Sequence, residues 1–186
     1  MHSSLWKDSR NAFDGESDVF KQYLSGHIAY ASELAIFLAP NINSYKRYAA
    51  GSWAPTTLAW GHDNRTCGFR IVGHGNGFRV ESRIPGADAN PYLAFAATIA
   101  SGMWGIRNKV EPPEMFLGNA YEAKDVPRVP TSLHEAVETF RGSTVAREAF
   151  GDFVFEHLLN TAVQEQVIFD NNCVTDWEMS RYFERG

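Results

Sequence analysis

Apolar residues recur every three or four positions through 17–38, with Pro40 just beyond, and this spacing predicts one amphipathic helix that lines a core. The next stretch, 41–55, has no such period and contains Asn, Ser, Gly and Pro, so we expect a long irregular loop that could hold a functional site. Three strand-like runs follow within 56–85, separated by the turn-forming sequences GHDN and GHGNG. Such short turns predict antiparallel pairing.

Helical patterns dominate the second half of the chain. Asn90 followed by Pro91 predicts a helix start, and the helix expected over 92–106 is apolar nearly all round, as is typical of a helix buried between layers. Capping pairs and amphipathic spacing predict three more helices, at 132–140, 152–169 and 175–183. Strands in the first half and helices in the second indicate an α+β fold with an antiparallel sheet backed by helices.

The length of 186 residues suits one domain, in which we distinguish a strand-rich site region at 41–85 and a helical region at 88–186. A net charge of −5 argues against nucleic acid as a partner, and no apolar run reaches the roughly 18–20 residues that span a bilayer. Cys67 and Cys173 match no disulfide framework, which favours a reducing compartment. We therefore expect a cytoplasmic protein with no nucleic-acid or membrane partner.

The segment RVESR at 79–83 is the most informative part of the chain. Side chains alternate along a strand, so Arg79, Glu81 and Arg83 should share one face. Two interpretations fit this pattern. The face could be an exposed surface of neighbouring ion pairs, or it could be a site that binds anions.

More arginines are expected to reach the same region. Arg65 and Arg70 lie five positions apart, and a bulge at Gly68 could aim both at one face. Arg47 lies in the expected loop. Planar guanidinium groups bind carboxylate and phosphate oxygens in pairs, so a cluster of arginines around one carboxylate favours a nucleotide-phosphate site in which Glu81 binds a divalent cation.

Two weaker patterns have simpler explanations. GHGNG at 73–77 resembles a phosphate-binding loop, but it lacks a lysine and a following helix, so a hairpin turn that needs glycine dihedral angles is favoured. His62, Cys67 and His74 match no spacing of a structural zinc site.

Six short motifs occur in order: NSYKR at 43–47, AP at 54–55, NRT at 64–66, FRI at 69–71, RVESR at 79–83 and NPYLA at 90–94. Together they resemble the C-terminal catalytic domain of the glutamine synthetase family, strongly up to about residue 106 and weakly beyond. The resemblance implies a ligase that uses ATP and Mg²⁺ or Mn²⁺. ATP would phosphorylate the γ-carboxylate of glutamate, and an amine or ammonia would then displace phosphate to give a γ-glutamyl amide.

The resemblance also implies roles for single residues. The positions matched to the nucleotide are His2 and Ser4, at the end of an HxHxS motif, together with Arg65, Arg70 and Arg79. Of these, Arg65 and Arg70 are implied to act on the transferring phosphoryl group. Glu81 is implied to be a metal ligand, and Arg47 and Arg83 match positions that hold the carboxylates of glutamate.

One departure concerns the second substrate. Ammonia-using members carry a glutamate before Ala-Pro that helps to bind and deprotonate ammonium, and this chain has Trp53 there. An indole cannot take that proton but could wall a roomier pocket, so we expect a larger amine, as in the γ-glutamylpolyamine and γ-glutamylputrescine ligase branch. The alternative is that Trp53 only packs the loop. The loop between Arg70 and Arg79 is also shorter than in ammonia-using relatives and lacks their lysine.

A second departure concerns extent. The sequence begins in the middle of the HxHxS motif, so the first histidine, the upstream acidic metal ligands and the small N-terminal domain of the family lie outside it. We therefore expect the isolated chain to have no appreciable synthetase activity. Two other readings of function are a non-catalytic fragment that keeps an anion half-site or an oligomer contact, and a phosphotransferase on a related fold. Full-length relatives form ring homo-oligomers.

Overall fold

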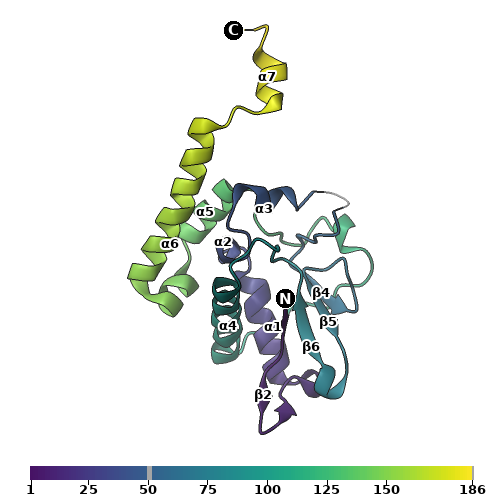
Figure 1. The fold of residues 1–186 in the computed structure, drawn as a ribbon. Helices are drawn as coiled ribbons and strands as arrows, with labels where there is room; N and C mark the ends of the chain where they lie inside the picture. The colour runs from purple at the N-terminus through teal and green to yellow at the C-terminus, as the bar shows by residue number, and fades with distance from the viewer. Residues whose placement is uncertain (50–51, 186) are drawn as a thin grey trace.

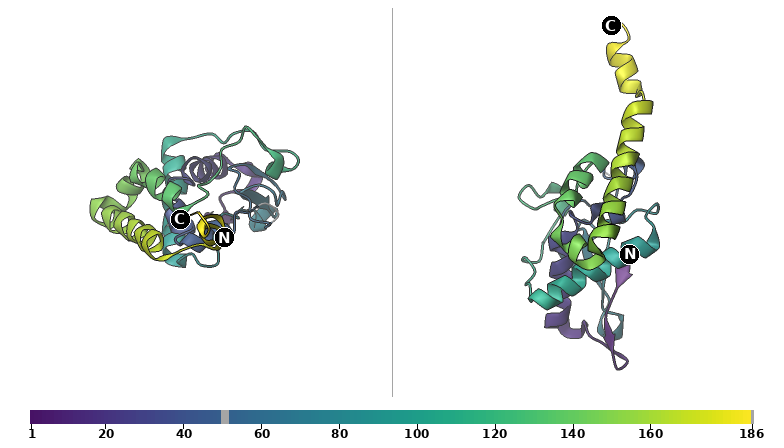
Figure 2. Two further views of the ribbon diagram at one scale, coloured as in Figure 1. Left: turned by 90° about the horizontal axis from the view of Figure 1, so that it is seen from above. Right: turned by 90° about the vertical axis from the view of Figure 1, so that its left-hand side faces the viewer.

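The computed structural model describes residues 1–49 and 52–185 and has the expected α+β fold (Figure 1). Its elements are, in order, β1 (His2–Ser3), β2 (Trp6–Lys7), β3 (Arg10–Asn11), α1 (Asp18–Tyr30), α2 (Ala35–Leu38), α3 (Ile42–Lys46), β4 (Trp60–His62), β5 (Phe69–Val72), β6 (Arg79–Ser82), α4 (Pro91–Asn108), α5 (Leu133–Arg141), α6 (Thr144–Asn172) and α7 (Asp176–Tyr182). Helices α1 and α4 back the sheet, the first half of α6 packs against α4 and α5, and its second half projects from the body together with α7 (Figures 1 and 2).

The main sheet has the strand order β1-β6-β5-β4. β6 pairs antiparallel with β1 and β5, but β4 runs parallel to β5, so the expectation of an entirely antiparallel sheet is wrong for this pair. The chain after β4 turns back, and Gly68 and Phe69 donate their N–H groups to the carbonyls of Thr57 and Ala59. A Cβ atom on Gly68 would lie 2.6 Å from the Thr57 oxygen, so glycine permits this close return rather than a bulge.

The GHGNG sequence forms the turn between β5 and β6, which confirms the hairpin interpretation. Gly73 and Gly75 have φ angles of 82° and 52°, where residues with a side chain are strained. The amide of Asn11 donates to the carbonyls of Gly75, Asn76 and Phe78, with an N···O distance of 2.6 Å at Phe78. These contacts fix the hairpin that leads into β6.

The single helix expected over 17–38 is instead two, because α1 ends at Tyr30 and α2 begins at Ala35. The expected irregular loop also contains a helix, α3, of which Asn41 and Ser44 form the capping box. The sequence does not predict this box, because serine replaces the usual glutamate or glutamine. The part of the loop at 50–51 lies outside the described residues.

Helix α4 begins at the predicted cap, where Asn90 accepts from two backbone N–H groups. It crosses α1 very closely, since a Cβ atom on Gly105 would lie 2.0 Å from the Gln22 carbonyl oxygen. However, α4 is not buried all round: Tyr92 and Ile99 are 83% and 60% exposed. Its small residues pack closely against α1, it also contacts α2 and α6, and the side that carries Tyr92 and Ile99 is exposed.

The C-terminal helices begin where capping predicts them, at Ser132 and Thr175. α6 starts earlier than expected and is interrupted at Gly151, which has a φ of 74°. Within the described residues, no helix combines the length and apolar character needed to cross a membrane. Cys67 and Cys173 are both free thiols.

Candidate functional site

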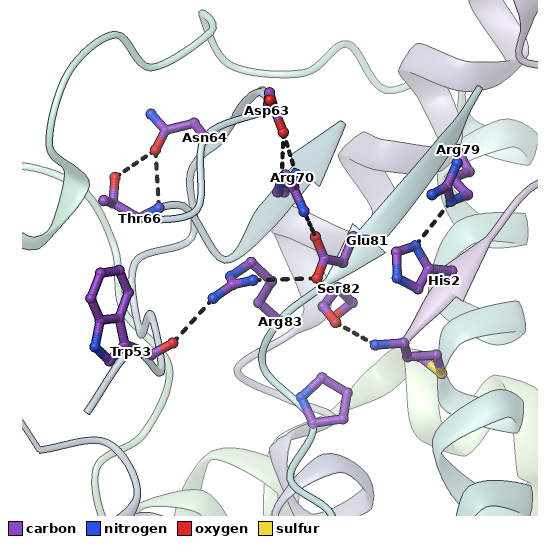
Figure 3. Close-up of polar contacts among 12 residues, drawn as sticks. His2, Trp53, Asp63, Asn64, Thr66, Arg70, Arg79, Glu81, Ser82 and Arg83 are labelled. Atoms are coloured by element: carbon purple, nitrogen blue, oxygen red, sulfur yellow. Dashed lines mark hydrogen bonds and ion pairs between the residues drawn. The ribbon is translucent and has the colours of Figure 1, made fainter. Parts of the chain in front are cut away.

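The Glu81 carboxylate lies on the sheet face opposite the core and is held by two arginines. Arg70 on β5 pairs across the strands with Glu81 on β6, and its NH1 donates to Glu81 Oε2 at 2.9 Å. Arg83 NH1 donates to the other oxygen, Oε1, at 3.3 Å (Figure 3). We call Arg70, Glu81 and Arg83 the Glu81 cluster. Strand alternation produces it, because the intervening Val80 and Ser82 are buried on the other side.

The Glu81 cluster is not a freely solvated surface pair. The side chains of Arg70, Glu81 and Arg83 are 15%, 15% and 13% exposed. Burial by itself raises the pKa of Glu81, but the Arg70 hydrogen bond and the charges of Arg83 and Arg70 outweigh it, so the pKa lies below its usual value. Glu81 is therefore ionised at neutral pH, and its negative charge partly neutralises the largely buried guanidinium groups of Arg70 and Arg83.

Asp63, which no motif in the sequence singles out, binds the other edge of the Arg70 guanidinium. Arg70 Nε donates to Asp63 Oδ1 at 2.9 Å, and NH2 donates to the same oxygen. Asp63 follows β4, whose parallel pairing with β5 places the GHDN turn beside Arg70. The two residues are seven positions apart, and strand alternation alone does not indicate that this turn folds back onto Arg70.

Arg79 and His2 form a second pair on the neighbouring strands. β1 aligns His2 with Glu81, and Arg79 Nε donates to His2 Nδ1 at 3.1 Å. Partial burial lowers the pKa of His2, in agreement with a neutral ring whose Nδ1 accepts. Ser4 lies beyond β1, where its hydroxyl accepts from the indole N–H of Trp6 at 2.9 Å.

Arg47 braces the site from α3 rather than joining the Glu81 cluster. Its guanidinium donates to the carbonyls of Arg83 and Ile84, both at 2.8 Å, and of Pro85 at 3.1 Å. Three of its five N–H donors therefore hold the backbone beside Arg83, and two are left for a ligand.

Arg65 lies away from the Glu81 cluster. It is exposed on the turn after β4, and no hydrogen bond within the described residues joins it to Glu81. It lines a shallow hollow with Met115 and Leu117. The structure thus brings Arg70 and Arg83 onto Glu81 and places Arg79 on the same strand, but it does not gather all the predicted arginines at one point.

Trp53 lies at the edge of the Glu81 cluster. Its carbonyl accepts from Arg83 NH2 at 3.2 Å, its φ is 60°, and its side chain is 72% exposed (Figure 3). The backbone is therefore tied to the cluster, while the indole stands free of the core. A substrate contact by the Trp53 indole stays a prediction.

A complete metal site cannot be built from this chain's described residues. Within them, no group of three His, Cys, Asp or Glu side chains lies where it could hold a metal ion. Glu81 is the carboxylate that the sequence predicts as a ligand, and arginines occupy both of its oxygens. Each oxygen keeps a second lone pair, so Glu81 can provide one ligand beside its arginines, and other groups must complete the site.

Comparisons with known proteins agree with the motif analysis. A family model for the glutamine synthetase catalytic domain matches residues 1–182. The chain is 51% identical to the γ-glutamylethanolamide synthetase GlnA4 of Streptomyces coelicolor over 100% of its length, and 44% identical to a glutamate–isopropylamine ligase of a Pseudomonas species over 90%. It is also 37% identical to a glutamine synthetase of Thermococcus kodakarensis over 98%.

The fold of the chain is also similar to that of solved structures. A GmaS structure in complex with ADP matches 98% of this chain with a TM-score of 0.88 at 28% identity. The chain spans 45% of that protein, and 40% and 37% of the ethanolamide synthetase and the isopropylamine ligase. It therefore corresponds to part of a longer catalytic unit. The chain belongs to the glutamine synthetase family and represents part of its catalytic domain.

Proposed function

We propose that this chain, within the complete enzyme, forms part of an ATP-dependent ligase that joins the γ-carboxyl group of glutamate to a small primary amine. The observation that carries this proposal is the Glu81 cluster, in which a half-buried carboxylate is held between Arg70 and Arg83. Fixed positive charge around a shielded carboxylate suits the binding of phosphate and carboxylate groups. The same cluster lies within the RVESR and FRI motifs of the family.

The proposed reaction has two steps. A γ-carboxylate oxygen of glutamate attacks the γ-phosphorus of ATP, and the bond to the leaving oxygen of ADP breaks. The neutral amine then attacks the acyl carbon, phosphate leaves with the glutamate oxygen, and the amine loses a proton. Positioning and charge neutralisation provide most of the acceleration of phosphoryl transfer, and arginines supply both.

We assign the residues of this chain to the two substrates as follows. Arg65, Arg70 and Arg79 contact ATP, with Arg65 and Arg70 acting on the transferring phosphoryl group. His2 and Ser4 lie beside the nucleotide, and the contact between Arg79 and His2 supports a shared surface there. Arg83 and the two free donors of Arg47 hold the carboxylates of glutamate.

Glu81 as a ligand of Mg²⁺ or Mn²⁺ stays a proposal of the same kind. It requires further ligands from outside the described residues, so we route no step through the metal. Assembly of the complete enzyme into a ring homo-oligomer is likewise proposed from the family, and its mass in solution would test it.

Trp53 leads us to propose a small amine with one positive charge rather than a polyamine. The second ammonium group of a diamine would need a partner of its own. Within the described residues, the two carboxylates of the site, Glu81 and Asp63, are already paired with Arg83 and Arg70. An exposed indole beside them offers an apolar wall to a short carbon chain. The relatives that use ethanolamine and isopropylamine, by their names, support this narrower class.

The test is amide formation by the complete enzyme with ethanolamine, isopropylamine, putrescine and ammonium as acceptors. We expect the highest kcat/KM with the first two. Trp53→Ala should lower the preference for isopropylamine over ammonium by about tenfold, because loss of a wall of a few carbons is worth 1–3 kcal/mol. Exposed Trp177→Ala, on the distant α7, is the control and should leave the preference unchanged. A clear preference of the unaltered enzyme for ammonium or putrescine would contradict the proposal.

A further inference from the structure

Arg70 is held at two separate edges of its guanidinium group. NH1 donates to Glu81 Oε2 at 2.9 Å, and on the other side Nε and NH2 both donate to Asp63 Oδ1 (Figure 3). A guanidinium that is anchored only at NH1 can pivot about that contact. The second anchor fixes the plane of the group, so two donors, one each on NH1 and NH2, are left in defined directions.

The backbone around Asp63 is built to hold this position. Asp63 has a φ of 49°, in the left-handed region, and its N–H donates to the carbonyl of Ile71 at 2.9 Å. Ile71 is the residue after Arg70 on β5. The turn after β4 is thus hydrogen-bonded to the strand that carries Arg70, and the carboxylate is presented to the guanidinium from a fixed backbone.

An ordinary surface ion pair is the competing explanation, since the side chain of Asp63 is 79% exposed. Its partner is different, because the Arg70 side chain is only 15% exposed and belongs to the Glu81 cluster. The pair therefore couples a solvated carboxylate to a shielded arginine of the site. Because Asp63 itself packs against little, its removal should leave folding intact while freeing Arg70.

We propose that Asp63 is a positioning residue that aligns Arg70 for the phosphoryl group, an inference that rests on the proposed function of the Glu81 cluster. Asp63 touches Arg70 and acts through it. The negative charge of Asp63 opposes phosphate binding, whereas its hydrogen bonds to Arg70 orient the guanidinium toward the phosphoryl group in the transition state. The two effects have opposite signs, and this predicts a kinetic signature that a purely structural residue would not give.

The experiment measures kcat and the KM for ATP in the complete enzyme with Asp63→Ala and Asp63→Asn. We expect kcat of the alanine variant to fall by about tenfold or more, because small misplacements of a catalytic group cost up to about a hundredfold. The KM for ATP should stay the same or fall. The asparagine variant keeps one oxygen acceptor for Arg70, so its kcat should lie between those of the alanine variant and the unaltered enzyme.

Asp8→Ala is the matched control, because Asp8 is also exposed and has a φ of 50°. It lies in the β2–β3 turn and should leave both constants unchanged. If kcat of Asp63→Ala stays within twofold of the unaltered enzyme, or if the loss is a rise in KM at constant kcat, the proposal is overturned.

A second readout does not depend on turnover. Crystal structures of the complete enzyme and of Asp63→Ala should show one orientation of the Arg70 guanidinium in the first and several, or a displaced one, in the second. An unchanged guanidinium in the variant overturns the positioning role. If the unaltered enzyme forms no amide, the proposed function fails, while the crystallographic comparison still decides whether Asp63 positions Arg70.

Discussion

His27 gives a sharp prediction about stability and pH. Its ring is buried between Tyr23 and Phe69, and Ser101 Oγ lies 3.0 Å from Nδ1. The single hydroxyl hydrogen of Ser101 donates to the Thr98 carbonyl, so we assign the hydrogen of the ring to Nδ1. Nε2 is buried and has no hydrogen-bond partner within the described residues. Protonation there would place an unpaired charge in the core.

The magnitude follows from the pKa of this ring. Burial lowers the pKa of His27 from 6.5 to about 3 in the folded chain, and the unfolded chain keeps the ordinary value. Between these two values the unfolded state binds the extra proton, so the free energy of unfolding falls as the pH is lowered below 6.5. The slope is about 1.4 kcal/mol per pH unit, so the contribution between pH 7.5 and 5.0 is about 2 kcal/mol.

The assay is urea unfolding of the chain at pH 7.5 and 5.0, followed by circular dichroism, with and without His27→Gln. The unaltered chain should lose about 2 kcal/mol more stability than the variant across this range, because all other titrating groups cancel in the comparison. Exposed His134→Gln is the control and should keep the slope of the unaltered chain. Equal pH slopes for the chain and His27→Gln would refute the burial of a neutral ring.

Two further predictions concern packing and the site. Gly105→Ala should destabilise the chain by about 1–3 kcal/mol in thermal or urea unfolding, since the new Cβ atom would lie 2.0 Å from the Gln22 carbonyl oxygen, whereas Gly142→Ala, with its nearest atom at 3.8 Å, should change little. Equal effects would contradict the close helix crossing. Arg83→Lys in the complete enzyme should lower kcat/KM for amide formation at least about tenfold, because one ammonium cannot reproduce the two contacts of the planar group, NH1 to Glu81 and NH2 to the Trp53 carbonyl. Activity within twofold would refute that role.

Features set by neighbouring residues could be predicted from the sequence. The helix starts at Asn90, Ser132 and Thr175 follow from capping chemistry, and each is confirmed. The shared face of Glu81 and Arg83 follows from strand alternation and is confirmed by their hydrogen bond. Helix capping and strand alternation depend on residues a few positions apart, so they can be predicted without knowledge of the fold.

Features set by tertiary contacts could not be predicted in the same way. The chain after β4 returns to Thr57, β4 pairs in parallel with β5, and this arrangement brings Asp63 to Arg70. The sequence places Arg47 with the arginines around Glu81, but in the structure its guanidinium donates to the backbone carbonyls of Arg83 and the two residues that follow. The sequence predicts that helix α4 is buried on all sides, yet it packs against α1, α2 and α6 and leaves Tyr92 and Ile99 exposed. The hydrophobic pattern of a helix shows which of its faces are apolar, but the tertiary fold determines which elements pack against those faces.

The most direct test of the central claim, that glutamate is activated as an acyl phosphate, is oxygen transfer from glutamate to phosphate. The complete enzyme would be supplied with ATP, ethanolamine and glutamate labelled with ¹⁸O in the γ-carboxyl group, and the phosphate released would be analysed by mass spectrometry. One labelled oxygen should appear in each phosphate for each amide formed, because the carboxylate oxygen that attacks ATP leaves with phosphate. Amide formation accompanied by unlabelled phosphate would contradict the account.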